Sequence, residues 1–245
     1  QIAKMILSAQ SFAGTGVASA GNIGGNYIKP SACQFAPCVD GMCLWINGTN
    51  LFQTLMLNLV PQDLNSRDIP PWEDSAIVET AMKSWHNAVS FAGTVQRYVP
   101  LSRFIRVIDK KSVFFTNGLK TTADSNDPMK AYYRHSNKEP YVSCKLLEYK
   151  AVWRDVHSFL AIGLDNHKRP QCLNFASQLS ASGTIDAGVQ YLVHIVGLAT
   201  NKDKVLLWRH ERIPLPSVLL NDVNLIERIG QLINQAEEVN RKLKN

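Results

Sequence analysis

The sequence predicts an α+β fold, with β-hairpins in the main part of the chain and a long helix at its C-terminal end. Two apolar runs, at 189–198 and 204–213, are joined by the polar residues 200–203, which is the length and chemistry of a β-hairpin. From residue 219 onward, apolar side chains recur at alternating spacings of four and three, which is typical of a helix with one apolar seam. A chain of 245 residues is also long enough to bury a large core.

Short helices and strands alternate in the first hundred residues. The helical spacing of apolar residues predicts a helix over 1–12. An apolar run predicts a strand over 42–46, and a second helix is predicted over 50–59. Pro61 ends that helix, and a further short helix is predicted over 76–86. The side chains that share the apolar face of the 50–59 helix are Leu51, Leu55 and Leu59.

The sequence in the middle of the chain predicts one β-hairpin, one further strand and one helix. Apolar residues over 101–108 and 111–116 predict two strands with a tight turn between them. A polar loop over 119–140 and a strand over 141–149 follow, and then a helix over 152–161. The side chains expected to point inward from this helix are Trp153, Val156 and Leu160.

The C-terminal helix is expected to leave an apolar seam for other helices to cover. Pro214 and Pro216 are expected to stop the second strand of the last hairpin, after which the helix runs to the final residue. The seam therefore predicts a helical bundle whose other helices are missing from this chain or come from another subunit. The seam residues are Leu225, Ile229, Leu232, Ala236, Val239 and Leu243.

Charge and composition favour a polyanionic partner over a membrane. The chain has 26 Lys and Arg against 20 Asp and Glu, a net charge of +6 and a pI near 9.1. Hydrophobic residues at 45% and charged residues at 19% exclude bulk disorder. The longest apolar run, 189–196, is interrupted by Gln190 and His194 and falls short of the roughly 20 residues that a membrane span needs.

The cysteines do not form a recognisable metal site. Cys33, Cys38 and Cys43 are five residues apart rather than in the close pairs that bind zinc, and buried thiols are the commoner explanation. We therefore expect neither a metal nor a cofactor. An odd count of 5 cysteines without a signal peptide predicts a reducing, cytoplasmic location.

Enzyme chemistry has little support in the sequence, and we expect a protein that is not an enzyme. There is no G-x-S-x-G, H-E-x-x-H or P-loop motif. His210 and Glu211 lie in a predicted strand between Arg209 and Arg212, which favours a charged sheet face over a catalytic dyad. A hydrolase that uses a Cys–His pair stays open as an alternative, because such partners need only meet in space.

Basic residues cluster around two predicted turns. Phosphate neutralisation needs several such groups on one surface, and turns would place Lys110, Lys111 and Lys202 at exposed tips that can enter a groove. The alternative is that these are ordinary solvated loop lysines. The first cluster is Arg97, Arg103, Arg106, Lys110, Lys111 and Lys120, with Asp109 as its one acid, and the second is Lys202, Lys204, Arg209 and Arg212.

Several stretches resemble the large-subunit (CasA) family of the type I-E CRISPR Cascade surveillance complex. The most specific is 196–216, VGLATNKDKVLLWRHERIPLP, which is similar to the family pattern G-L-A-T-[DN]-x-x-K-V-L-x-W-R-H-E-R-x-P-L-P almost position by position. Three other stretches match in the family's order, so the resemblance covers most of the chain. They are 50–61, 127–134, and 151–155 followed by Arg169 and Pro170.

The resemblance implies a fold and a domain order. It implies a mixed α/β DNA-recognition domain over 1–216, with part of its N-terminal side missing. The first helix of a C-terminal four-helix bundle would follow over 217–245, with the rest of the bundle missing. We therefore expect the chain to be an internal fragment of a family member.

The resemblance also implies a non-catalytic role in antiviral defence. Family members recognise the protospacer-adjacent motif in foreign double-stranded DNA, help open the duplex for guide RNA pairing, and dock the helicase–nuclease. The implied partners are therefore target DNA, the guide RNA-bound Cascade backbone and small subunits, and that helicase–nuclease. An RNA-binding scaffold subunit of the same complex is the alternative within this family of assemblies.

Matching the family's elements to this sequence implies the residues that contact DNA. Its lysine finger corresponds to Lys111 or Lys110, and its hairpin wedge to the tip that carries Lys202. Well-known members carry a Gln at the wedge where this chain has Lys202, and the family's glycine loop is expected just before Gln1. The full set of expected DNA contacts is Lys110, Lys111, Asn201, Lys202 and Lys204.

Overall fold

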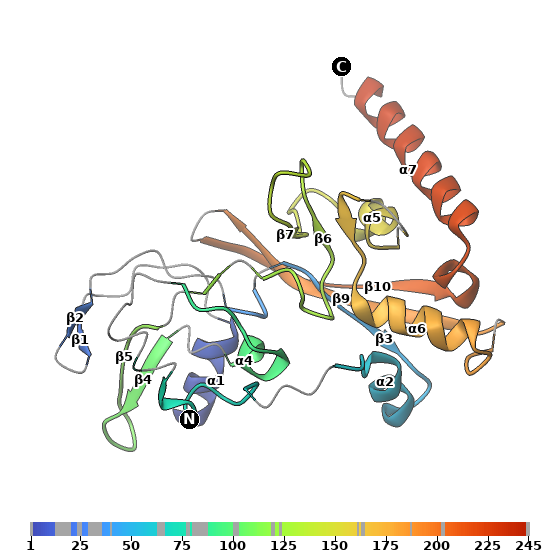
Figure 1. Ribbon diagram of the computed structural model, residues 1–245. Coiled ribbons are helices and arrows are strands. Elements are labelled where there is room, and N and C mark those ends of the chain that lie inside the picture. Colours follow the sequence, from blue (N-terminus) through green and yellow to red (C-terminus); the bar gives the residue numbers. More distant parts are fainter. Residues whose placement is uncertain are drawn as a thin grey trace. The chain divides into compact units, whose positions relative to one another are not determined.

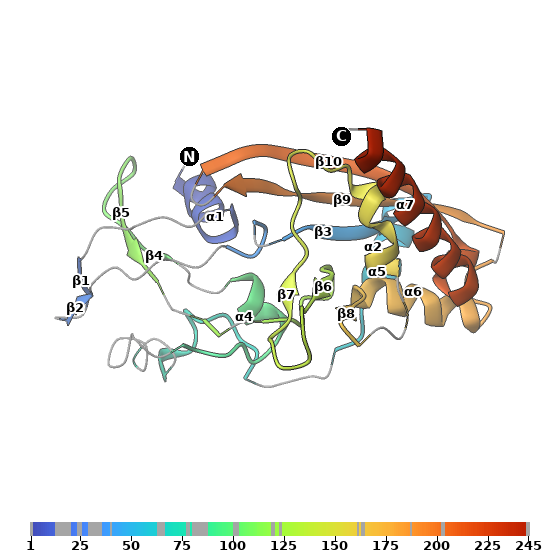
Figure 2. The same ribbon diagram turned by 90° about the horizontal axis from the view of Figure 1, so that it is seen from above.

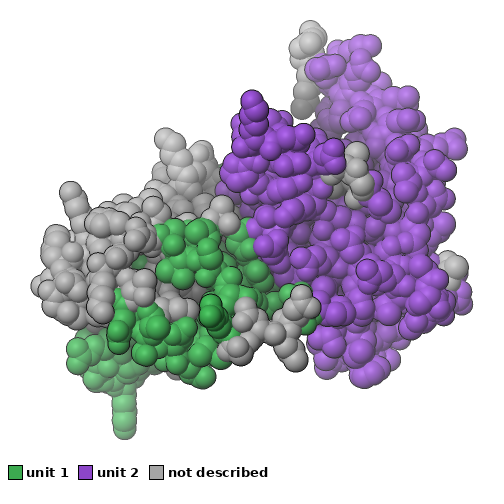
Figure 3. Space-filling view, in the orientation of Figure 1, with its two compact units in different colours: residues 1–40, 62–124, 200–206 green, residues 41–61, 125–199, 207–245 purple. Residues whose placement is uncertain are grey.

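In a computed structural model, the chain forms two compact units (Figure 3). Unit 1 comprises residues 1–40, 62–124 and 200–206, and unit 2 comprises residues 41–61, 125–199 and 207–245. Helices and antiparallel sheets occur in both units, which confirms the α+β fold. The structure describes residues 2–12, 21–23, 26–28, 36–39, 41–62, 67–76, 79, 88–99, 103–118, 121–122, 124–160, 162, 165–186, 188–201 and 204–243.

In its described part, unit 1 combines two small sheets with helices α1 (Ile2–Phe12) and α4 (Thr94–Tyr98). Helix α1 confirms the helix predicted over 1–12, and its Gln10 Nε2 group donates to the Arg103 carbonyl at 2.5 Å. The strands are β1 (Gly21–Ile23) paired with β2 (Asn26–Ile28), and β4 (Arg103–Val107) paired with β5 (Val113–Asn117). The β4–β5 pair confirms the first predicted hairpin.

Unit 2 is built around a three-stranded sheet with the order β10-β9-β3 (Figure 1). Strands β9 (Gln190–Asn201) and β10 (Lys204–Pro216) confirm the predicted C-terminal hairpin. Strand β3 (Cys43–Asn47) confirms the strand predicted over 42–46 and pairs antiparallel with β9. A second sheet has the order β7-β6-β8 and contains β7 (Val142–Ser143), β6 (Tyr132–Tyr133) and β8 (His167–Lys168).

Helices α5, α6 and α7 of unit 2 gather at the same end of the β10-β9-β3 sheet in both ribbon views (Figure 2). Among the described residues, no helix combines the length and the apolar character that crossing a bilayer requires. The helical elements of this unit are α2 (Leu51–Asn58), the 3₁₀ turn η1 (Val152–Asp155), α5 (Val156–Leu160), α6 (Gln171–Ala181), the 3₁₀ turn η2 (Ser217–Leu220) and α7 (Val223–Leu243).

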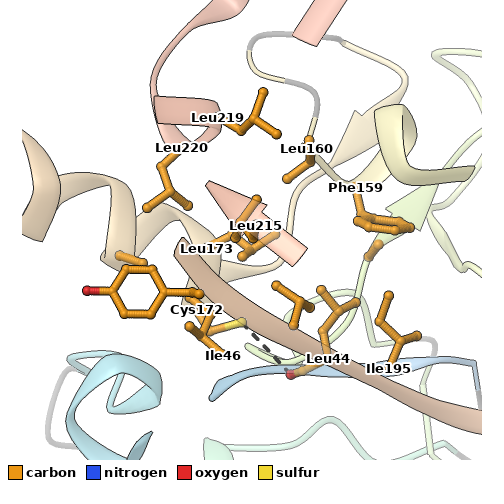
Figure 4. Packing of buried hydrophobic residues seen from close by; sticks show 14 of the residues in the cluster. Leu44, Ile46, Phe159, Leu160, Cys172, Leu173, Ile195, Leu215, Leu219 and Leu220 are labelled. Carbon is orange, nitrogen blue, oxygen red and sulfur yellow. Dashed lines mark hydrogen bonds between the residues drawn. The ribbon is translucent and has the colours of Figure 1, made fainter. Parts of the chain in front are cut away.

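The main hydrophobic core lies between one face of this sheet and the helices (Figure 4). Leu44 and Ile46 are two residues apart on β3, so both side chains point to the same face, where they are buried. Each large apolar side chain that is fully buried stabilises the fold by roughly 1.5–3 kcal/mol relative to an exposed one. The other labelled members of this core are Phe159, Leu160, Cys172, Leu173, Ile195, Leu215, Leu219 and Leu220.

Helix α2 covers the Ile46 position at the edge of β3 that faces away from β9, through one asparagine. The Ile46 N–H donates to Asn58 Oδ1 at 2.9 Å, and Asn58 Nδ2 donates to the Ile46 carbonyl at 2.7 Å. The helix begins after Asn50, whose side chain accepts the Gln53 N–H at 2.8 Å. The amide of Asn58 therefore stands in for a neighbouring strand at the edge of the sheet.

Two elements between the hairpins differ from their prediction. The strand predicted over 141–149 is confined to β7, and residues 144–146 have no regular structure. The helix predicted over 152–161 begins as a 3₁₀ turn, which has three residues per turn instead of 3.6. That change of phase buries Val152 and leaves Trp153 51% exposed, so the expected inward position of Trp153 is wrong. The helix predicted over 76–86 falls largely outside the described residues.

The two prolines at the end of β10 differ in their effect. Strand β10 continues through Pro214, contrary to expectation, and ends at Pro216, as expected. It is an edge strand of its sheet, and a residue that lacks an N–H group is tolerated where that group would face away from the neighbouring strand.

The long helix α7 buries a different face from the predicted seam. Ile226, Gly230 and Ile233 are its buried residues, and Leu225 and Ile229 pack at the margin of the core. The outer seam residues Leu232, Ala236, Val239 and Leu243 are exposed in this chain. The part of the predicted seam from Leu232 to Leu243 therefore remains an exposed apolar stripe along the C-terminal half of α7.

Candidate nucleic-acid interface

The β4–β5 hairpin presents two lysines at its tip, as the sequence predicts. The strand register leaves residues 108–112 as the turn, which the Ile108 N–H closes by donating to the Ser112 carbonyl at 3.2 Å. Lys110 and Lys111 are both exposed in this turn. Ile108 is 63% exposed, so an apolar side chain accompanies the two cations.

Asp109 holds the turn that carries the lysines. Its Oδ1 atom accepts the N–H groups of Lys111 at 2.7 Å and Ser112 at 2.8 Å. The Ser112 hydroxyl, followed by the two N–H groups, lowers the pKa of the Asp109 carboxyl below its usual value. The backbone at the tip is therefore ordered before any ligand binds.

Only part of the first basic cluster is available to a ligand. Arg106 is exposed, but Arg97 and Arg103 are 8% and 5% exposed. Arg97 forms an ion pair with Asp124, and Lys120 lies outside the described residues. Counting charges along the sequence overstates the positive surface, because the acid that neutralises Arg97 comes from a distant segment.

The second predicted tip lies at the end of the β9–β10 hairpin. Asn201 is the last residue of β9 and Lys204 is the first residue of β10. Lys202, at the expected wedge, lies outside the described residues, as do the side chains of Asn201 and Lys204. These three residues belong to unit 1 together with Lys110 and Lys111. Their contact with DNA stays a prediction.

Arg209 in the second basic cluster has a structural role. Its guanidinium donates to the carbonyls of Leu147 at 2.9 Å, Glu148 at 2.8 Å and Lys150 at 2.5 Å. This side chain therefore holds the 147–150 turn against β10 and is not available to a phosphate. Arg212 of the same strand is exposed.

Two of the described cysteines, Cys144 and Cys172, are poor nucleophiles. Burial raises the pKa of the Cys144 and Cys172 thiols to about 12, so very little thiolate exists at neutral pH. The Cys172 thiol instead faces the Leu44 carbonyl at 4.0 Å inside the core (Figure 4). Among the described residues, which do not include Cys33, no three His, Cys, Asp or Glu side chains form a group that could hold a metal ion.

His210 and Glu211 point to opposite faces of β10, because successive strand residues alternate. Glu211 Oε2 accepts the Val152 N–H at 2.9 Å, and its other oxygen lies 3.4 Å from Arg209 Nε. His210 instead faces His194, with their ring nitrogens 3.0 Å apart. These two neighbours therefore do not form a dyad.

Sequence reasoning missed a row of rings across the outer face of the sheet. Trp45 of β3 lies opposite His194 of β9, with ring centroids 4.9 Å apart, and the His194 and His210 centroids are 5.0 Å apart. The strand register brings these three residues together, and no local sequence motif links them. The one available signal in the sequence was the alternation of side chains between the two faces of each strand.

Comparison with known proteins identifies the family. A family model for CRISPR-associated protein Cse1 matches residues 1–245, the whole chain. The chain belongs to the Cse1 family. The resemblance to CasA described above is thereby confirmed, since a curated relative from Thermus thermophilus, CRISPR-associated protein CasA/Cse1, is 27% identical over 256 residues. That match covers 100% of this chain and 48% of the relative, so the chain spans about half the relative's length.

Several solved structures share the fold. The structure of Thermus thermophilus CasA (Cse1) superimposes with a TM-score of 0.77 at 25% identity, over 100% of this chain and 53% of that one. Thermobifida fusca Cse1 gives a TM-score of 0.69 at 20% identity, over 94% and 48%. A chain of a CRISPR RNA-guided surveillance complex gives 0.67 at 17% identity, over 97% and 48%.

Proposed function

We propose that this Cse1-family chain is a non-catalytic DNA-recognition subunit of a type I-E Cascade ribonucleoprotein in the cytoplasm. It recognises the protospacer-adjacent motif in foreign double-stranded DNA, helps open the duplex for guide RNA pairing, and docks the helicase–nuclease. Its partners are target DNA, the guide RNA-bound backbone and small subunits, and that nuclease. Family membership supports this proposal, as does the shared fold with a chain of an RNA-guided surveillance complex.

The ordered lysine tip of the β4–β5 hairpin is the observation that carries the proposal. When base pairing with a guide RNA reads the sequence, the protein need read only a short motif and hold the opened duplex. A few positioned basic groups are enough for that task. Unstacking a base step costs a few kcal/mol, so groups that offset this cost belong on stiff hairpins. The Asp109 bonds to Lys111 and Ser112 supply such stiffness.

We assign residues 1–216 to the DNA-recognition domain and residues 217–245 to the first helix of a four-helix bundle. The exposed apolar stripe of α7 supports the second assignment, because a bundle helix needs partners along such a stripe. Its most exposed members are Leu232, Val239 and Leu243.

Two lysine substitutions in the complete guide-loaded complex test the DNA role. Lys111→Ala and Lys202→Ala should weaken binding to duplexes that carry the motif without unfolding the subunit. If each lysine contacts one phosphate, the slope of log affinity against log salt should fall by about 0.9 for each substitution. Binding to duplexes with an intact or a scrambled motif, measured over a range of salt concentrations, gives both quantities.

Lys138→Ala is the matched control, because Lys138 is an exposed turn lysine of unit 2 and its loss removes the same charge. We expect this variant to retain the affinity and the salt slope of the parent. If Lys111→Ala and Lys202→Ala also retain both, the assigned tips are wrong.

Leaving the subunit out of the complex separates DNA reading from the scaffold alternative. A loss of binding that depends on the motif supports the DNA reader. A subunit whose binding requires guide RNA and shows no motif preference would instead be an RNA-binding scaffold.

A further inference from the structure

A polar pocket of about 510 Å³ in unit 2 carries an excess of positive charge. Residues of β6, β8 and the first turn of α6 line it, and four cationic side chains face two carboxylates there. The charged residues of its lining are Lys130, Arg134, Lys168, Arg169, Asp127 and Asp165.

Two of these cations are held only by neutral groups among the described residues. Arg134 Nε donates to the Asp165 carbonyl at 3.0 Å, and Lys168 Nζ donates to the Ser125 hydroxyl at 2.8 Å. Both cations also lie over the Tyr141 ring, at 4.7 and 4.6 Å from its centroid. These contacts fix the positions of the two side chains and leave their charges uncompensated.

Arg169 is a third cation without a carboxylate partner in the described part of the chain. It is 8% exposed, and its Nη1 group donates to the Leu220 carbonyl at 2.9 Å. Its Nε and Nη2 groups are buried and have no hydrogen-bond partner among the described residues. Burial lowers the pKa of this guanidinium to about 10, because the charged form is poorly solvated there. A buried charge of this kind is costly unless an anion compensates it.

The carboxylates of the pocket do not supply that compensation. Asp127 lies 3.6 Å from Lys130 and also accepts the Met129 N–H at 2.9 Å. Asp165 is exposed to solvent, where its charge is screened. The three cations Arg134, Lys168 and Arg169 therefore leave a net positive field in the pocket.

The start of helix α6 adds to this field. Gln171 and Asn174, in the first turn of this 11-residue helix, line the pocket directly after Arg169 and Pro170. The N-terminal end of a helix carries partial positive charge and favours anions. The helix end and the buried guanidinium thus act on the same space.

We propose that this pocket binds a phosphodiester group of a nucleic-acid backbone, with Arg134, Lys168, Arg169 and the first turn of α6 as its site. Arginine and lysine side chains and a helix N-terminus are the groups that proteins use for phosphate. The volume of about 510 Å³ exceeds that of a free phosphate and admits the attached sugars. The nucleic-acid part of this assignment rests on the proposed function, whereas anion binding itself does not.

Thermal unfolding of the purified protein tests anion binding without any nucleic acid. Inorganic phosphate should raise the melting temperature above that in chloride of equal ionic strength, since a ligand of the folded state stabilises it. In Arg169→Met the apparent phosphate affinity should fall about tenfold or more. Each variant is compared with its own melting temperature in chloride, because Arg169→Met removes both an uncompensated buried charge and the hydrogen bond to the Leu220 carbonyl. If this variant does not fold, Lys168→Met provides the same comparison.

Arg97→Met is the matched control. Arg97 is also 8% exposed, but it is paired with Asp124 in unit 1. Its substitution should lower the melting temperature and leave the phosphate-induced rise unchanged. Equal phosphate-induced rises in the parent, Arg169→Met and Lys168→Met would overturn the proposed site.

Two measurements on the guide-loaded complex distinguish the sources of the phosphodiester. If Arg169→Met weakens binding to target duplex, the group comes from DNA. If it weakens association of the subunit with the guide-loaded remainder, the group comes from guide RNA. If Arg169→Met loses phosphate binding but changes neither binding to target duplex nor association of the subunit with the guide-loaded remainder, the nucleic-acid assignment is overturned. Failure of the lysine-tip experiment with an intact phosphate effect would count against the proposed function alone.

Discussion

His194 and His210 lie on the neighbouring strands β9 and β10 with His194 Nδ1 3.0 Å from His210 Nε2. A hydrogen bond between two ring nitrogens needs one donor and one acceptor, so it is lost when both rings are doubly protonated. Burial lowers the pKa of His194, and the positive charges of His210 and Arg212 lower it further. The folded protein therefore opposes protonation of His194.

We expect the protein to lose stability as the pH falls below the ordinary histidine pKa. The pKa of His194 in the folded chain lies below the ordinary histidine value of 6.5, so the unfolded chain binds more protons in acid. This contribution to stability is complete above pH 6.5 and declines as the pH falls toward the folded pKa. Urea unfolding at about pH 7.5 and about pH 5.5 measures it, and His194→Gln should reduce the difference.

His135→Gln is the control for this pH dependence, because His135 is exposed in the loop after β6. It should retain the parent difference between the two pH values. Burial also lowers the pKa values of His157 and His167, so His194→Gln reduces the pH effect without abolishing it. A full parental difference in His194→Gln would show that the histidine pair does not contribute.

Truncating two adjacent side chains of α7 should have very different effects on the free energy of unfolding. Ile233→Ala should lower the free energy of unfolding by about 2–4 kcal/mol, because it leaves a cavity in a buried face. Leu232→Ala should change it by less than about 0.5 kcal/mol. The parent side chains are 8% and 58% exposed, respectively. Equal losses in urea unfolding would mean that the two faces of α7 are assigned wrongly.

The core beneath the sheet should be far more sensitive than the outer face of α2. Leu44 is 1% exposed and Leu51 is 73% exposed. Leu44→Ala should cost about 2–5 kcal/mol and Leu51→Ala less than about 0.5 kcal/mol, since only the first creates a cavity. Chemical denaturation of the two variants, compared through their midpoints at equal slope, provides the measurement. A stable Leu44→Ala variant would contradict the packing in Figure 4.

Thiol alkylation should spare the partly buried Cys144 and the buried Cys172 of the native protein. Cys144 and Cys172 have pKa values raised to about 12, so iodoacetamide at neutral pH should modify them only after unfolding. Mass spectrometry with and without urea reports each site. Rapid modification of either thiol in the native protein would revive the hydrolase alternative.

Secondary-structure elements that are determined by residues close together in the sequence were predictable. The β4–β5 hairpin follows from two apolar runs around a turn whose Asp109 bonds its own neighbours. Trp153 was misplaced because a 3₁₀ turn and an α-helix distribute the same residues differently over their faces. Residues 141–149 contain apolar side chains, but only Val142 and Ser143 pair with a strand.

Some residues of the candidate sites are placed by contacts between segments that are distant in the sequence, so their burial and charge compensation could not be predicted from it. The lysine tip lies within a single turn, so its exposure could be predicted. Burial of Arg97 could not, because its partner Asp124 is 27 residues away. Arg169 was visible only as part of a family motif. Its uncompensated charge becomes apparent once β6, β8 and α6 line one pocket.

The two prolines at the end of β10 also protect the sheet from growth. The Ser217 N–H donates toward β9, to the Val189 carbonyl at 3.0 Å, so alternation directs the backbone nitrogens of Pro214 and Pro216 outward. An approaching strand from another molecule would find no donor at either position. This end of the edge strand is therefore a poor template for edge-to-edge aggregation, although the rest of its backbone is extended.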